Sequence, residues 1–237
     1  IHDSSKSWSC CLPWLKPIAI LGEQVLQAPV VTPGHRSQSD GSMGDWANWV
    51  HAGKITSMES LESKSEIRQR AISARPQSSA GLAANLVRLT MELDVKVIAS
   101  YQPLATEPDV SEFNAWVLAM GKTLLLPRIV GDELEFATGD LELGSHQIHE
   151  PTGDAADIAT AELILLPALA VDGSGNRIGK GKGYYDRALS GVSGIPKYAV
   201  VFDSEILPSI TAEEHDVWVT GAVTPTAIHH FRASAIS

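Results

Sequence analysis

Apolar residues recur with the period of a helix in two segments that follow residue 58. In the segment 78–93, leucines return every three or four positions, which predicts an amphipathic helix with its leucine face in the core. The leucines are Leu82, Leu86, Leu89 and Leu93. A helix is also predicted over 63–75, because Ser63 and Glu66 have capping-box spacing and Pro76 ends the apolar stripe.

Strand patterns alternate with these helices along the chain. Residues 163–166 form a continuous apolar run before Pro167, which is typical of a strand buried on both faces, whereas 133–137 alternate as in a one-face strand. Other strands are predicted at 95–101, 123–126, 197–202 and 217–223, and other helices at 110–120 and 183–189. The fold class is therefore α/β: a mostly parallel sheet flanked by helices on both faces, in a single three-layer domain.

Residues 1–57 lack either period. They contain both cysteines, Cys10 and Cys11, and a glycine- and serine-rich stretch at 32–44. We interpret this region as a disordered extension or as a remnant of upstream or expression-derived sequence, with a targeting role as the less favoured alternative. The predicted domain accordingly covers residues 58–237.

Composition limits the function classes. A formal net charge of −10 argues against general nucleic-acid binding, which usually needs a basic face. The longest apolar region, 18–31, is interrupted by Glu23 and Pro29 and is shorter than the roughly 20 residues of a membrane span. Adjacent cysteines give neither a disulfide framework nor a metal-ligand spacing. A monomeric, cytoplasmic protein with no membrane or nucleic-acid partner is expected.

The strand at 163–166 leads into a basic, glycine-rich loop. Gly179, Gly181 and Gly183 alternate with Lys180 and Lys182, and Arg177 precedes them. Glycines allow backbone N–H groups to approach an anion closely, and clustered cations repel one another unless an anion lies among them. The spacing matches neither a P-loop nor a dinucleotide-binding fingerprint. The loop therefore predicts a polyphosphate site of another kind, with a solvated lysine hairpin as the alternative.

Most of the other candidate side chains follow predicted strands. Ligands of open α/β sheets bind outside the carboxyl ends of the strands, and the segments 101–109, 127–128, 171–185 and 203–216 lie there. Asp186 and Asp216 are the best carboxylate pair for Mg²⁺, which prefers oxygen ligands and keeps several waters. Taken alone, the residues favour a structural reading over a metal site, with Asp186 as a first-turn helix carboxylate and Asp216 as a turn residue.

The loop also carries a specific resemblance. The run Asn176-Arg-Ile-Gly-Lys-Gly-Lys-Gly-Tyr-Tyr-Asp186, preceded by Leu-Pro-Ala-Leu-Ala-Val-Asp172, resembles the signature of the 5-formyltetrahydrofolate cyclo-ligase family. The resemblance extends over roughly 63–226. It departs from the family pattern at Val171, where an aromatic is frequent, and at Ala168, where glycine is common.

The resemblance implies an ATP- and Mg²⁺-dependent enzyme that converts 5-formyltetrahydrofolate into 5,10-methenyltetrahydrofolate. The implied ATP-binding residues are Lys64, Arg68, Arg177, Ile178, Gly179, Lys180, Gly181, Lys182, Gly183, Tyr184 and Tyr185. The implied folate-binding residues are Tyr101, Gln102, Glu107, Lys180 and Tyr184. Asp186 and Asp216 are the implied metal ligands, and Lys182, Arg177 and Lys180 the implied catalytic cations.

Two other functions stay open at this point. A non-catalytic nucleotide- or phosphate-binding module would use the same loop, and binding of ATP would not distinguish it from the enzyme. A sugar-phosphate isomerase or transferase on a similar α/β scaffold would act without ATP. Lys64 and Arg68, four residues apart on the first predicted helix, would in either case also fit an ordinary solvated helix face.

Overall fold

The computed structural model describes residues 62–76, 78–144, 148–213 and 216–231. All of these lie within one compact unit, Thr56–Ser237. The extension predicted for residues 1–57 lies outside the described residues.

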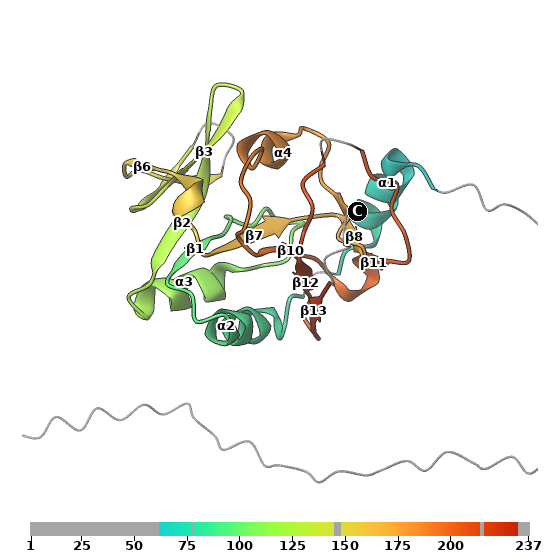
Figure 1. The fold of residues 1–237 in the computed structure, drawn as a ribbon, viewed down its shortest axis with the longest axis horizontal. Helices are drawn as coiled ribbons and strands as arrows, with labels where there is room; N and C mark the ends of the chain where they lie inside the picture. The colour runs from blue at the N-terminus through green and yellow to red at the C-terminus, as the bar shows by residue number, and fades with distance from the viewer. Residues whose placement is uncertain (1–61, 77, 145–147, 214–215, 232–237) are drawn as a thin grey trace, which may run out of the picture. The chain divides into compact units, whose positions relative to one another are not determined.

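Eight strands form the main sheet, in the order β13-β12-β10-β7-β1-β2-β3-β6 (Figure 1). The five strands from β12 to β2 are parallel, and β13, β3 and β6 join the two sides antiparallel. The predicted mostly parallel sheet is thus confirmed. The main-sheet bounds are β1 Val97–Ala99, β2 Thr123–Val130, β3 Glu133–Ala137, β6 Ala155–Ala156, β7 Leu163–Pro167, β10 Lys197–Val200, β12 Gly221–Val223 and β13 Ile228–His230.

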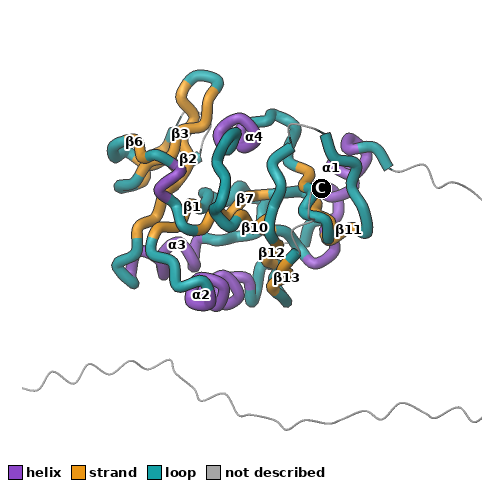
Figure 2. Tube along the Cα trace, viewed as in Figure 1, coloured by secondary structure: helices purple, strands orange, loops and turns teal. Residues whose placement is uncertain are grey.

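Two smaller sheets lie outside the main one. β4 and β5 pair as an antiparallel ribbon, and β8 lies between β11 and β9. Their bounds are β4 Leu141–Leu143, β5 His149–Pro151, β8 Ala170–Asp172, β9 Arg177–Ile178 and β11 Ile206–Leu207. These strands, β6 and β13 were not predicted from the sequence. Figure 2 shows that much of the chain between β7 and β10 is loop, interrupted by the short elements β8, β9 and α4.

Successive residues of the central strands point to opposite faces of the sheet, and each face has its own core. On β7, Leu163 and Leu165 pack with the helices α2 and α3, whereas Ile164 and Leu166 pack with Leu189 beyond α4. Figure 1 shows α2 and α3 on one side of the strands and α4 on the other. This period-two burial on both faces explains why residues 163–166 are all apolar. The three-layer α/β prediction is confirmed.

The helices begin where local chemistry allows. α1 starts with the predicted capping box: the Ser63 hydroxyl accepts from the Glu66 N–H, and the Glu66 carboxylate accepts from the Ser63 N–H. α2 starts at Leu82 rather than near residue 78, because Gly81 has a positive φ of 94°. The helix bounds are α1 Lys64–Ala74, α2 Leu82–Glu92, α3 Ser111–Ala119 and α4 Tyr184–Ala188, with 3₁₀ turns η1 Ile158–Thr160 and η2 Asp203–Glu205.

None of the helices in the described ranges has the length and apolar character needed to cross a membrane.

Candidate functional site

A cavity of about 270 Å³ lies at the carboxyl ends of β1 and β7, against the middle of β2. It is lined by segments that follow those strands, by the glycine loop and by the start of α1. All of the predicted site residues line it except Ile178. The side chain of Ile178 is buried with Ile67 and Leu169 in a small core between α1 and β8. Only its main chain can therefore belong to a binding loop.

The glycine loop, residues 179–183, has the backbone that its sequence predicts. Gly181 and Gly183 have φ values of 89° and 67°, in a region of backbone conformation that residues with a Cβ rarely adopt. The loop is attached to α1, because Arg68 Nε donates to the Gly179 carbonyl at 2.9 Å. Arg68 thus lies against the loop and is not a solvated helix residue.

The two candidate metal ligands are neighbours. Asp186 Oδ1 accepts from the Val217 N–H at 3.1 Å, so the residue after Asp216 contacts the first carboxylate. Asp186 also pairs with Arg177 at 2.5 Å, and the Arg177 side chain is almost completely buried. Asp216 accepts from Lys64 Nζ at 2.7 Å and from the Glu213 N–H at 2.8 Å. Asp216 therefore binds the main chain of Glu213 and lines the cavity at the same time.

This group of Lys64, Arg177, Asp186 and Asp216 is named here the ionic end of the cavity. Its charges compensate one another across three chain segments. Desolvation lowers the pKa of Lys64, but hydrogen bonds and charges from Asp216 and Glu213 outweigh it, so that the pKa is raised overall. The ammonium group is consequently charged at neutral pH.

The donor set of the ionic end fits a hard cation. Both hydrogen bonds to Asp186 among the described residues end on Oδ1. Carboxylate oxygens are the ligands that Mg²⁺ prefers. Within the described ranges, no three His, Cys, Asp or Glu side chains converge as a complete metal site. A magnesium ion here would therefore take its other oxygens from water and phosphate, as this ion commonly does.

The opposite part of the cavity is apolar. Tyr101, Leu104, Ile129 and Leu134, named here the apolar end, form its walls. The Tyr101 phenol is buried and donates to the Pro108 carbonyl at 2.8 Å, so it fixes the bend of the loop after β1. Burial raises the pKa of Tyr101 well above its ordinary value. The phenol is thus a neutral wall of the cavity.

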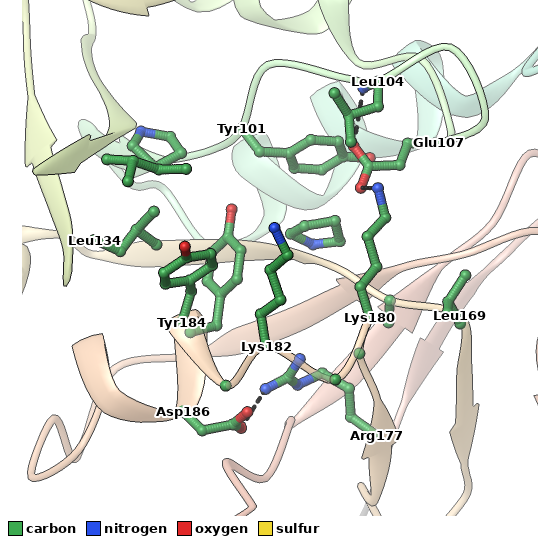
Figure 3. Close-up of a pocket in the computed structure, with 18 of the residues that line it drawn as sticks. Tyr101, Leu104, Glu107, Leu134, Leu169, Arg177, Lys180, Lys182, Tyr184 and Asp186 are labelled. Carbon is green, nitrogen blue, oxygen red and sulfur yellow. Dashed lines mark hydrogen bonds and ion pairs between the residues drawn. The ribbon is translucent and has the colours of Figure 1, made fainter. Parts of the chain in front are cut away.

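Glu107 is the acid of this second compartment. One of its carboxylate oxygens accepts from the Leu104 N–H at 2.9 Å, and the other pairs with Lys180 Nζ at 2.7 Å. The Glu107 side chain is only 6% exposed. Figure 3 shows Lys180 extending from the glycine loop to Glu107, and Lys182 extending in the same general direction. The two lysines therefore span the distance between the ionic and apolar ends.

Two tyrosines follow the glycine loop with different surroundings. The Tyr184 ring is contacted by two cations, with Lys182 Nζ 5.8 Å and Arg187 Cζ 5.3 Å from its centroid. Tyr185 packs against the α4-side core. Burial is the main cause of the strongly raised pKa of Tyr185, and the charge of Glu107 adds to it. Both tyrosines line the cavity, while Gln102 completes its wall after β1.

One wall of the cavity was not predicted from the sequence, apart from Pro127 in the segment 127–128. Pro127, Ile129, Leu134, Ile148 and Glu150 contribute to it from β2, β3 and the β4–β5 ribbon. The alternation at 133–137 was the available signal, since it marked a strand with one face free to meet a ligand. Nearby Arg128 has a structural role: it pairs with Glu135 and donates to two carbonyls across the ribbon.

The cavity therefore has the features of a site for a phosphate-bearing ligand beside a larger, partly apolar one. A glycine loop with lysines and a carboxylate pair suits the first ligand, and buried rings with the nearby acid Glu107 suit the second. The comparisons with known proteins narrow this class to a family.

The chain belongs to the 5-formyltetrahydrofolate cyclo-ligase family, whose model matches residues 51–225. A 5-formyltetrahydrofolate cyclo-ligase of Mycolicibacterium smegmatis is 34% identical over 148 residues, which cover 57% of this chain and 76% of the relative. The mouse enzyme of the same name is 29% identical, over 67% of this chain and 89% of its own.

Solved structures agree on the fold. A 5,10-methenyltetrahydrofolate synthetase of Aquifex aeolicus superposes with a TM-score of 0.60 at 24% identity, covering 73% of this chain and 95% of that one. The synthetase of Mycoplasma pneumoniae superposes with a TM-score of 0.56 at 21% identity, covering 69% and 99%. The resemblance seen in the sequence is thereby confirmed, and the chain is an enzyme of this ligase family.

Proposed function

We propose that the protein joins N5 and N10 of 5-formyltetrahydrofolate through the formyl carbon, with ATP and Mg²⁺, to give 5,10-methenyltetrahydrofolate, ADP and phosphate. The observation that supports this most is that Lys180 and Lys182 lie between the ionic end and Glu107 in the same cavity. A site for a nucleotide alone would not need the acid and the apolar end. All residues invoked lie within 58–237, which we propose as the catalytic domain.

The chemistry explains why both ends are needed. A formamide carbon is a poor electrophile, and its oxygen is a poor leaving group. Transfer of the γ-phosphoryl group to the formyl oxygen releases ADP and creates a good leaving group. N10 of the same folate then attacks the formyl carbon, the C–O bond breaks, and phosphate departs as the N10 proton is lost. Positioning and neutralisation of charge supply most of the catalysis in such steps.

The residues divide this work between them. Lys182 and the N–H groups of the glycine loop stabilise the charge that develops on the transferred phosphoryl group. Arg68 holds the loop against α1, and Arg177 orients Asp186. Asp186 and Asp216 would hold the magnesium ion, which supplies charge neutralisation at the phosphates when bound. Lys180, paired with Glu107, orients the folate against the nucleotide.

The test is direct, because the methenyl product has its own absorbance. Purified protein is incubated with 5-formyltetrahydrofolate, magnesium and ATP, and parallel samples omit ATP or magnesium. The proposal is supported if the methenyl product forms only when both ATP and magnesium are present. Folded protein that binds ATP without forming product would instead be a nucleotide-binding module, and turnover of a sugar phosphate without ATP would favour the isomerase alternative.

A further inference from the structure

A buried arginine behind the cavity joins four parts of the chain. Arg75 follows the last residue of α1, and its side chain is 3% exposed. Its Nε donates to Glu205 at 2.7 Å, and its Nη1 donates to the Thr106 carbonyl at 2.8 Å. Its Nη2 donates to the Ala168 carbonyl and, at 3.3 Å, to the second oxygen of Glu205. The guanidinium thus donates hydrogen bonds to three other segments of the chain and uses all three of its nitrogens.

Of the two residues that supply these carbonyls, Ala168 lines the cavity and Thr106 is the neighbour of a residue that does. Thr106 immediately precedes Glu107, the acid of the apolar end. Ala168 lies between Pro167 and Leu169, and all three line the cavity after β7. Arg75 itself does not line it. Its contact with the cavity wall is therefore through the main chain of Ala168, and its contact with Glu107 is indirect, through the carbonyl of Thr106.

The counter-charge of Arg75 is equally fixed. The Glu205 side chain is 4% exposed and also accepts from the Phe202 N–H at 2.8 Å. Arg75 Cζ is 5.7 Å from the centroid of the Phe202 ring. A planar guanidinium can serve a carboxylate and two carbonyls at once, whereas an ammonium group on a flexible stem cannot reproduce that geometry. The arrangement is therefore specific for arginine.

We propose that Arg75 is a positioning residue for the folate side of the reaction, because it fixes the Thr106–Glu107 loop and the turn after β7 relative to each other. The inference rests on the proposed function and adds a residue that does not touch either ligand. The ionic end has its own fixed contacts, Lys64 with Asp216 and Arg177 with Asp186. Loss of the Arg75 bonds is consequently expected to affect the folate much more than ATP.

The experiment compares variants that separate charge, stability and geometry. Arg75→Lys keeps the charge but loses the fork. The double variant Arg75→Met/Glu205→Gln removes both charges, so no buried ion is left unpaired, and the glutamine still offers an oxygen to Phe202. Arg70→Met is the matched control. Arg70 lies on α1, the helix that Arg75 follows, and pairs with Glu62 on the surface; the two side chains are 49% and 39% exposed.

KM for 5-formyltetrahydrofolate is expected to rise roughly tenfold or more in both Arg75 variants, since small misplacements of binding groups are costly. KM for ATP is expected to stay within about twofold of the wild type, and Arg70→Met to leave both constants unchanged. Near-UV circular dichroism and thermal unfolding establish that each variant is folded at the assay temperature. If the folded double variant has the wild-type KM for folate, or if both KM values rise together, the proposal is overturned.

The wild-type assay separates the two possible failures. If the wild type forms no methenyl product, the proposed function fails, and equilibrium binding of 5-formyltetrahydrofolate without ATP still tests Arg75. Weaker folate binding by the double variant than by the wild type supports the positioning role in that case. Equal binding, or no folate binding by the wild type, overturns it.

Discussion

The ionic and apolar ends of the cavity are organised in opposite ways. At the ionic end, charged side chains from α1, β9 and α4 and those of Glu213 and Asp216 pair with one another, so that the groups are held in place by electrostatics. At the apolar end, Tyr101 and Leu134 are held by packing, and the carboxylate of Glu107 is fixed by an N–H group and a lysine. With the proposed function, we expect the ionic end to govern turnover and the apolar end to govern affinity for the folate.

The largest effect on kcat is expected at Lys182, one of the two lysines between the ionic and apolar ends. Lys182→Ala removes a cation from the place where phosphoryl transfer develops charge, and kcat is expected to fall by about 10²- to 10³-fold. Steady-state kinetics with both substrates saturating measures this. Lys96→Ala is the matched control, because Lys96 is exposed at the amino end of β1, away from the cavity. A Lys182→Ala enzyme with near-normal kcat would contradict the assigned role.

A second effect is expected at the carboxylate pair. Asp186→Asn should raise the magnesium concentration for half-maximal activity by roughly tenfold or more, since changes around a metal site commonly cost that much affinity. It should also lower the free energy of unfolding by about 1–3 kcal/mol, because Arg177 is buried and loses its charged partner. Magnesium titration and urea unfolding measure the two effects separately.

Asp216→Asn tests the other aspartate of the carboxylate pair. Lys64 keeps Glu213 at 2.9 Å as a second partner, so this substitution is expected to cost less stability than Asp186→Asn while also raising the magnesium requirement. An unchanged magnesium requirement in both variants would show that these aspartates only hold the cations of the ionic end.

Most strands of the main sheet, though not β6 and β13, were predictable because their signals are local. The apolar run of β7 and the alternation of β3 each follow from burial, and β3 has the predicted bounds, Glu133–Ala137. The capping box of α1 is likewise a matter of neighbouring residues. β8, β9 and β11 were missed, because two or three residues carry no period and their pairing comes from tertiary contacts. Asp172 illustrates this: its carboxylate accepts from the Ile210 N–H, 38 residues away.

The site was predictable where chemistry is concentrated in one stretch. The glycine loop can be recognised from its composition. The loop containing Glu107 was predicted at the same edge of the sheet because it follows a strand. The wall formed by Ile129 and Leu134 could not be predicted from composition, because apolar residues on a strand are as typical of a buried core as of a cavity wall. Arg75 was missed for a related reason, since its partners are main-chain carbonyls and a glutamate 130 positions away.

The smallest of these effects is expected at the apolar end. Leu134→Ala removes a side chain from the cavity wall, and KM for 5-formyltetrahydrofolate is expected to rise roughly fivefold to tenfold through lost apolar contact, with kcat and KM for ATP little changed. Val130→Ala on the neighbouring strand is the control, because Val130 is 54% exposed and does not line the cavity. A fall in kcat with unchanged KM in Leu134→Ala would contradict the division of labour, because it would give the apolar end a part in the chemical step that packing alone cannot supply.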